Sequence, residues 1–259
     1  MSTIAVSVPE IIAWLHLVLW PFLRISAMFS VAPVFGSRTI PVRMRIAMAV
    51  ALTVTLAPSL PVGTPPDPLS AAGLAAVATQ IVIGLSMGFA LQIVFAALHM
   101  AGELVATTMG LSMAQVTDPV NGVQVAVLGQ LFYMVGTLVF LALDGHLALL
   151  GMLLDSFHGM PVGSAPALAD AWALVSWAGL LFTSALQVAL PAVTALLAAN
   201  VMLGVITRSA PQLNLFAFGL PITTALGLVL LLLVLPELAG VLSRSMASAG
   251  SLLGGVYLR

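Results

Sequence analysis

Two stretches of this sequence continue without a charged side chain for longer than a lipid bilayer requires. No Asp, Glu, Lys or Arg lies between Asp67 and Glu103, nor between Asp170 and Arg208. About 20 apolar residues already form a helix that crosses a hydrocarbon core about 30 Å thick. Either tilt and helix breaks absorb the excess length, or these segments are buried against other protein, where lipid does not set their length.

Composition indicates that most of the chain avoids water. Hydrophobic residues make up 61% of the 259 positions and charged residues only 6%, whereas about 25% charged residues is usual in soluble domains. In hydrocarbon the backbone must form helices or a closed barrel, and the apolar stretches lack the alternation of barrel strands. The sequence therefore predicts an all-α membrane-type protein.

Polar breaks divide the chain into six long apolar stretches, all of which we expect to be helical. Pro191 and Pro221 mark points where the last two stretches can be interrupted. The expected helices run over Glu10 to Phe35, Ile46 to Leu60, Leu69 to Thr108, Val123 to Leu154, Ala171 to Ile206 and Leu213 to Leu242.

Charge and residue usage exclude several classes of function. The chain has no Lys or Cys, and its formal net charge is -1, so we expect no nucleic-acid partner, no disulfide and no thiolate metal site. It has no glycine-rich phosphate-binding motif, so we expect no nucleotide or other cofactor. Short cytoplasmic loops are enriched in Arg. Arg38, Arg43 and Arg45 therefore favour a cytoplasmic position for the first break.

The segment GLSMG, Gly84 to Gly88, matches the G-x-S-x-G pattern of serine hydrolases. That motif needs a strand, a tight turn and a helix, but Ser86 lies within an uncharged apolar stretch. We interpret Gly84 and Gly88 instead as a small-residue face for helix packing, with Ser86 bonded to its own backbone. An intramembrane protease is therefore not favoured.

The remaining polar side chains are interpreted as structural. His99 with Glu103, and Asp155 with His158, have the helical spacing of a metal or proton-relay pair, but neither has a third ligand, which favours ordinary hydrogen bonds. Arg24 lies inside an apolar segment, which costs several kcal/mol unless it faces protein or water. We expect a buried charge at Arg24 with a carbonyl or carboxylate partner; snorkelling to the membrane interface is the alternative.

The loop between the third and fourth stretches has an unusual composition. It reads TTMGLSMAQVTDPVNG, Thr107 to Gly122. Its glycines and its Asp-Pro and Asn-Gly pairs disfavour a helix, while its methionines make it more apolar than an ordinary exposed turn. The residues alone leave two interpretations open: a connecting loop, or a segment with a function of its own.

Three blocks of sequence together resemble one known family. They are RISAMFSVAPVFGSRTIPVRMRIAMA (Arg24 to Ala49), GLSMAQVTDP (Gly110 to Pro119) with DGHLALLGMLLDSFHGMPVG (Asp144 to Gly163), and TRSAPQLNLFAFGLP (Thr207 to Pro221). On these blocks nearly the whole chain resembles the FliR family of the type III secretion export gate. Two mild departures are Met113, where many relatives are expected to have an aromatic residue, and Asp144, where Asn is familiar.

The resemblance implies a domain organisation and a set of partners. It implies one export-gate domain over 1–259, with FliP-like helices over 1–168, a pore loop at 107–122 and a FliQ-like helical hairpin over 169–259. It also implies a hetero-oligomer with FliP and FliQ in the bacterial inner membrane, in part raised to the periplasmic side. Further expected partners are FlhB, FlhA, unfolded flagellar substrate proteins and membrane lipid.

The resemblance also implies site residues. The loop after the third stretch is expected to plug the pore at rest, and an exposed interhelical loop is the alternative. The cytoplasmic turn of the hairpin is expected at Arg208, Pro211 and Gln212. The expected plug residues are Met109, Gly110, Leu111, Ser112, Met113, Ala114, Gln115, Val116, Asp118 and Pro119.

These inferences predict a non-enzymatic structural subunit of the flagellar type III export gate, which helps to form and close the channel for unfolded flagellar proteins. The alternatives are a virulence-type (injectisome) gate subunit and a secondary transporter. A transporter would need two repeated halves and ionisable groups at the midplane. The sequence has neither a repeat nor a charge cluster beyond Arg24.

Overall fold

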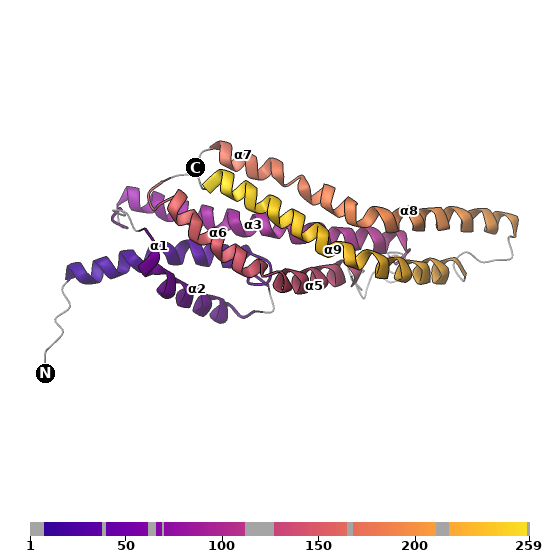
Figure 1. Ribbon diagram of the computed structural model, residues 1–259, viewed down its shortest axis with the longest axis horizontal. Helices are drawn as coiled ribbons and strands as arrows, with labels where there is room; N and C mark the ends of the chain where they lie inside the picture. Colours follow the sequence, from indigo (N-terminus) through magenta and orange to yellow (C-terminus); the bar gives the residue numbers. More distant parts are fainter. Residues whose placement is uncertain are drawn as a thin grey trace. The chain divides into compact units, whose positions relative to one another are not determined.

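The computed structural model of the chain describes residues 8–37, 40–61, 66–68, 70–111, 127–164, 168–210 and 218–257. Within these ranges the regular elements are helices, and none is a β-strand (Figure 1). They are α1 (Val8–Val31), α2 (Val42–Leu56), the 3-10 helix η1 (Ala57–Ser59), α3 (Ala71–Thr108), α5 (Val127–Ala142), α6 (Gly145–Gly159), α7 (Leu168–Trp177), α8 (Leu180–Ser209) and α9 (Leu220–Tyr257).

Several of these helices have the length and composition of membrane spans. Among the described residues, four helices are long and apolar enough to cross a membrane, or five if α5 and α6 form one broken span. The all-α membrane-type fold predicted from the sequence is therefore confirmed. Helices α3 and α9 each contain 38 residues, which corresponds to about 57 Å of helix. This length is nearly twice the thickness of a hydrocarbon core.

Helix breaks occur at positions that proline does not explain. The expected stretch from Val123 to Leu154 forms two helices, α5 and α6, with a break at Leu143 and Asp144. Asp144 has φ 53°, a left-handed conformation that Asp and Asn adopt more readily than other side chains. An Asn at this position would suit the same turn, because both side chains tolerate the left-handed conformation.

The prolines of the last two stretches do not divide them. Pro191 lies inside α8, and Pro236 lies inside α9. Pro221 is the second residue of α9, where its missing N–H group costs no helical hydrogen bond. The stretch expected from Ala171 to Ile206 is instead interrupted between α7 and α8.

Internal contacts divide the chain into two compact units. The first comprises Met1–Gln92, His146–Ala178 and Ser248–Arg259, and the second comprises Ile93–Gly145 and Gly179–Ala247. Helices α3 and α9 each contribute residues to both units.

In the first unit, α1 packs closely against the first part of α3. A Cβ atom at Gly84 would collide with the carbonyl oxygen of Arg24, and one at Gly88 would lie 2.7 Å from the carbonyl oxygen of Met28. Such distances exclude any side chain larger than that of glycine unless the helices move apart. The chain then turns into α2, whose Arg45 donates from Nε to the carbonyl oxygen of Phe35 at 3.1 Å.

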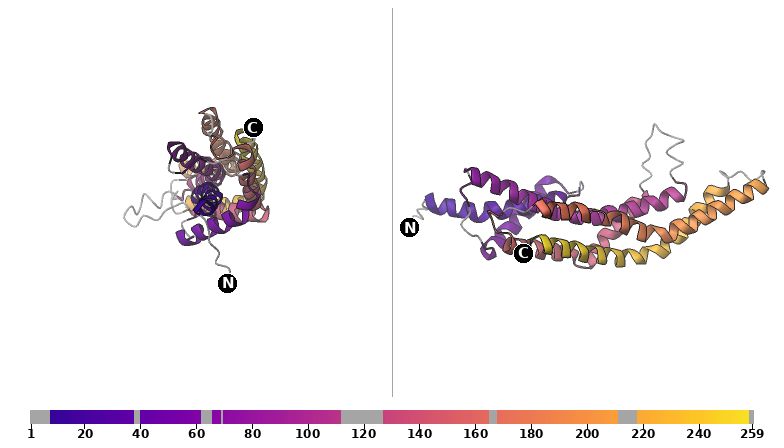
Figure 2. Two further views of the ribbon diagram at one scale, coloured as in Figure 1. Left: turned by 90° about the vertical axis from the view of Figure 1, so that its left-hand side faces the viewer. Right: turned by 90° about the horizontal axis from the view of Figure 1, so that it is seen from above.

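In the second unit, α8 and the part of α9 up to Ala247 run side by side as a hairpin (Figures 1 and 2). The hydroxyl oxygens of Ser184 and Ser245 lie 3.2 Å apart between these helices. The second half of α3 packs against α5 in the same unit, where the ring of Phe95 contacts those of Tyr133 and Phe140 edge to face.

Candidate functional site

The structure describes the first part of the expected plug. Helix α3 ends at Thr108, and the described chain continues through Met109, Gly110 and Leu111. The other expected plug residues lie outside the described residues: Ser112, Met113, Ala114, Gln115, Val116, Asp118 and Pro119. The candidate site is therefore the loop root, Met109 to Leu111, where the chain leaves α3.

Helix α3 ends in a Schellman motif. Gly110 has φ 85°, a conformation that glycine adopts without the steric cost of a Cβ atom. The N–H group of Leu111 donates to the carbonyl oxygen of Ala106 at 3.2 Å, and that of Gly110 donates to Thr107 at 3.1 Å. This motif pairs two of the four carbonyl groups that a helix leaves without a partner at its C-terminal end.

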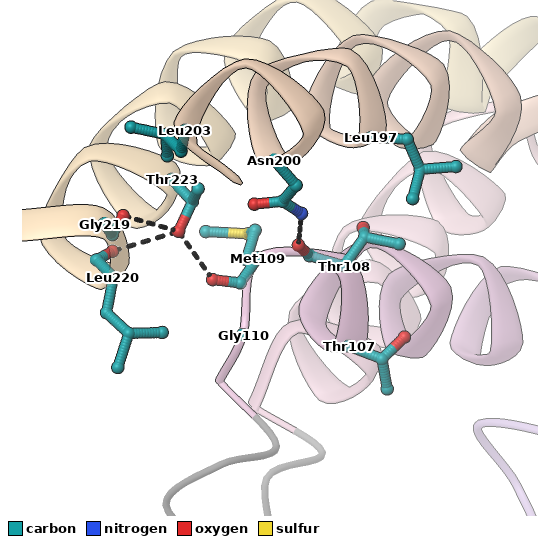
Figure 3. A pocket seen from close by; sticks show the side chains of 10 residues that line it. All are labelled: Thr107, Thr108, Met109, Gly110, Leu197, Asn200, Leu203, Gly219, Leu220 and Thr223. Atoms are coloured by element: carbon teal, nitrogen blue, oxygen red, sulfur yellow. Dashed lines mark hydrogen bonds between the residues drawn. The ribbon is translucent and has the colours of Figure 1, made fainter. Parts of the chain in front are cut away.

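Side chains from the α8–α9 hairpin bind the next two carbonyl groups (Figure 3). Asn200 of α8 donates from Nδ2 to the carbonyl oxygen of Thr108 at 3.1 Å, and Thr223 of α9 donates from Oγ1 to that of Met109 at 3.1 Å. The Thr223 hydroxyl also lies 3.1 Å from the carbonyl oxygens of Gly219 and Leu220. Because a hydroxyl has a single proton, these three acceptors compete for it.

Apolar contacts hold the same residues. The side chain of Met109 is completely buried, and its sulfur would lie 2.6 Å from a Cβ atom at Gly227 of α9. The thioether therefore occupies space that the missing side chain of Gly227 leaves open. A Cβ atom at Gly110 would lie 2.7 Å from Cδ2 of Leu220. A largely apolar cavity of about 560 Å³ adjoins the loop root, and Leu197 contributes to its lining (Figure 3).

Arg24 forms a second polar cluster, within the first unit. Its Nε donates to Oε1 of Gln80 at 2.8 Å, and its Nη1 donates to the carbonyl and hydroxyl oxygens of Ser156 at 2.8 and 3.0 Å. Its Nη2 donates to the carbonyl oxygen of Met160 at 2.8 Å, and its guanidinium carbon lies 4.0 Å from the ring centroid of Phe157. The side chain is fully buried, so it does not snorkel and it joins α1 to α3 and to the end of α6.

The G-x-S-x-G segment lies inside α3, without the strand and turn of a hydrolase. Ser86 donates to the carbonyl oxygen of Ile83 at 2.7 Å and also hydrogen-bonds the hydroxyl of Tyr257. Nε2 of His99 lies 3.3 Å from Oε1 of Glu103, one helical turn away. Within the described residues, no group of three or more His, Asp and Glu side chains is arranged to hold a metal ion.

The expected hairpin turn is described at one of its residues. Arg208 is exposed in the last turn of α8, where its charge interacts favourably with the helix dipole. Pro211 and Gln212 lie outside the described residues.

The sequence did not predict a role for Asn200, Thr223 or Gly227. An amide within an apolar segment such as LLAANVMLG was an available signal, because polar groups in membrane segments need partners. The sequence could not identify the partner of Asn200, because Thr108 lies 92 residues away along the chain.

Comparison with known proteins relates nearly the whole chain to one family. Residues 15–249 match the family described as bacterial export proteins, family 1. The flagellar biosynthetic protein FliR of Escherichia coli (strain K12) is 39% identical over 229 residues, which cover 88% of this chain and 87% of that protein. The FliR protein of Pectobacterium carotovorum is 40% identical over 228 residues, with the same coverage. That of Bacillus subtilis (strain 168) is 32% identical over 216 residues, or 82% of this chain and 83% of the relative.

Proposed function

The chain belongs to family 1 of the bacterial export proteins, and from this premise we propose that it is a structural subunit of the flagellar type III protein export gate. The observation that carries the proposal is the similarity to flagellar FliR proteins over 88% of the chain. These relatives are flagellar biosynthetic proteins, which disfavours an injectisome subunit. Membership of a family of export proteins disfavours a secondary transporter. The role is that of a channel component and not of an enzyme.

The proposed setting is a hetero-oligomer in the bacterial inner membrane. Long apolar side chains on the hairpin support it, because Val201 of α8 is 67% exposed and Leu233 of α9 is 68% exposed. Such surfaces need cover from lipid or from other subunits. FliP and FliQ are the proposed subunits, FlhB and FlhA are further partners, and unfolded flagellar proteins are the cargo.

Helix length supports the proposal that part of the assembly lies on the periplasmic side of the bilayer. Helices of 38 residues such as α3 and α9 exceed the hydrocarbon core by about 25 Å. Packing against sister subunits would cover that excess. We also propose the domain organisation that the family resemblance implies. Residues 1–168 resemble FliP, and the α8–α9 hairpin belongs to a FliQ-like part over 169–259.

The proposed means of closure is the loop that begins at Met109. Its sequence through Pro119 carries flexible apolar side chains, and hydrophobic constrictions stop ions by dewetting while they remain deformable. The Schellman motif at Gly110 supports a defined exit of the loop from α3. Arg208, Pro211 and Gln212 are proposed to form the cytoplasmic turn of the hairpin.

Deletion of Gly110 to Val116 tests this function. The assembled complex that contains the shortened subunit is expected to leak ions when it is reconstituted into liposomes, because the segment that excludes water from the channel is missing. Ion flux is measured with a pH- or potential-sensitive dye. The matched control is Arg208→Ala, which leaves the loop intact and should retain the seal. An intact seal in the deletion variant would place the closure elsewhere.

A further inference from the structure

We propose that Asn200 and Thr223 are positioning residues that hold the end of α3 on the α8–α9 hairpin, and so set the direction in which the plug loop leaves. The inference rests on the proposed closure function and names the part of the molecule that keeps the loop root in place. Both residues act through the α3 backbone and are not themselves part of the plug.

The last four carbonyl groups at the end of α3 all accept hydrogen bonds. A helix leaves its last four carbonyl groups without intrahelical partners. Here the N–H groups of Leu111 and Gly110 pair the carbonyls of Ala106 and Thr107. The hairpin supplies the donors for the two that remain, on Thr108 and Met109. All four groups are paired only when the helix end is seated on the hairpin.

Other hydroxyl groups of the hairpin show that this use of polar side chains is selective. The hydroxyls of Thr194, Thr207 and Ser209 bond to carbonyl oxygens three or four residues earlier in α8. Such bonds are what isolated threonines and serines make in an apolar helix. Asn200 differs, because its amide bonds to a residue 92 positions away. Thr223 makes such local bonds to Gly219 and Leu220, but its hydroxyl also reaches Met109, 114 positions away.

Side-chain packing also holds the end of α3 on the α8–α9 hairpin, independently of these hydrogen bonds. Met109 is completely buried with its thioether over Gly227, and Leu220 packs onto Gly110. Met109 and Gly110 thus both contact α9 (Figure 3). The path of the chain at Leu111 is consequently determined by the hairpin as well as by the Schellman motif.

Hydrogen exchange on the assembled complex, with the full-length subunit, tests directly whether Asn200 and Thr223 hold the end of α3 on the hairpin. The amides of Gly110 and Leu111 are expected to exchange about fivefold faster in Asn200→Ala, because one hydrogen bond that opposes local opening is lost. Thr223→Val should give a smaller increase, because its hydroxyl divides its proton among three acceptors. The double variant should exceed either single variant. Thr194→Val, which removes an exposed hydroxyl from the same hairpin, is the control and should leave the exchange unchanged.

The outcomes separate this inference from the proposed closure. Faster exchange together with ion leak supports both the attachment of α3 to the hairpin and the closure of the channel by the loop. Faster exchange with an intact seal supports the attachment and argues against closure by the loop. Unchanged exchange in Asn200→Ala and in the double variant would overturn the inference, even if deletion of the loop itself causes leak. If the double variant fails to assemble, Thr223→Val is compared with Thr223→Ser, which keeps the hydroxyl. Equal exchange in these two variants would also overturn it.

Discussion

At the scale of single residues, a buried guanidinium group is stable only when its donors find acceptors. Arg24 meets this requirement with an amide oxygen, a hydroxyl oxygen and two backbone carbonyl oxygens. The planar fork of Arg suits several acceptors in different directions, while Lys offers a single compact ammonium group. The cluster therefore depends on the shape of Arg as well as on its charge.

Replacement of Arg24 by Lys is expected to lower the free energy of unfolding by about 3 kcal/mol. The physical reason is that an ammonium group cannot serve Gln80, Ser156 and Met160 together, so buried acceptors remain unpaired. Denaturant unfolding of the purified complex measures the loss. Arg43→Lys is the control, because Arg43 is exposed at the start of α2. Equal stability of the two variants would show that the fork geometry at Arg24 is not needed.

At the scale of helices, close approach between α1 and α3 depends on glycine. Gly84 and Gly88 lie one turn apart on α3 and face backbone carbonyl oxygens of α1. Because each would need the helices to separate if it carried a side chain, the face determines the distance between the two helices. The sequence motif predicted a packing face, but it did not identify α1 as the helix that packs on it.

Gly84→Ala is expected to lower the free energy of unfolding by about 1–3 kcal/mol, because the new methyl group meets the Arg24 carbonyl oxygen in a packed core. Gly151→Ala is the matched control in α6, where a Cβ atom has no neighbour within 4 Å. That change should stabilise its helix by up to about 1 kcal/mol, because Ala has the higher helix propensity. Thermal unfolding in detergent compares the two. A stable Gly84→Ala variant would mean that α1 and α3 can separate at little cost.

At the scale of the whole molecule, many apolar side chains on the helices are exposed. Val201 and Leu233 are examples of apolar side chains that the described residues leave exposed. Lipid can cover only the length of helix that lies within the bilayer. Other subunits are the proposed cover for the remainder.

The full-length protein extracted in mild detergent is therefore expected to co-purify with two smaller helical membrane proteins, FliP and FliQ, each in excess over it. Native mass measurement of the purified complex gives the composition. An unrelated inner-membrane protein with the same affinity tag serves as the control for carry-over. Recovery of a monodisperse single chain that binds a small solute would instead favour a carrier.

Local properties of the sequence determined the helical membrane-type fold, the family and the bounds of α3. The expected end of the last helix at Leu242 was wrong, because α9 continues to Tyr257. Hydropathy and the pairing of backbone groups in lipid act within a segment, so a stretch such as Leu69 to Thr108 predicted α3 to within two residues of its start. The unusual position of Arg24 was also visible, because the cost of burying a charge does not depend on which partner offsets it.

Only the tertiary structure decided which residues meet. The acceptors of Arg24, the break at Asp144 and the contacts of Asn200 and Thr223 with the end of α3 were not predictable from the sequence. These features join groups that are distant along the chain or depend on a backbone conformation that neighbouring elements hold in place. A single sequence records that a polar group needs a partner, but the path of the chain through space selects the partner.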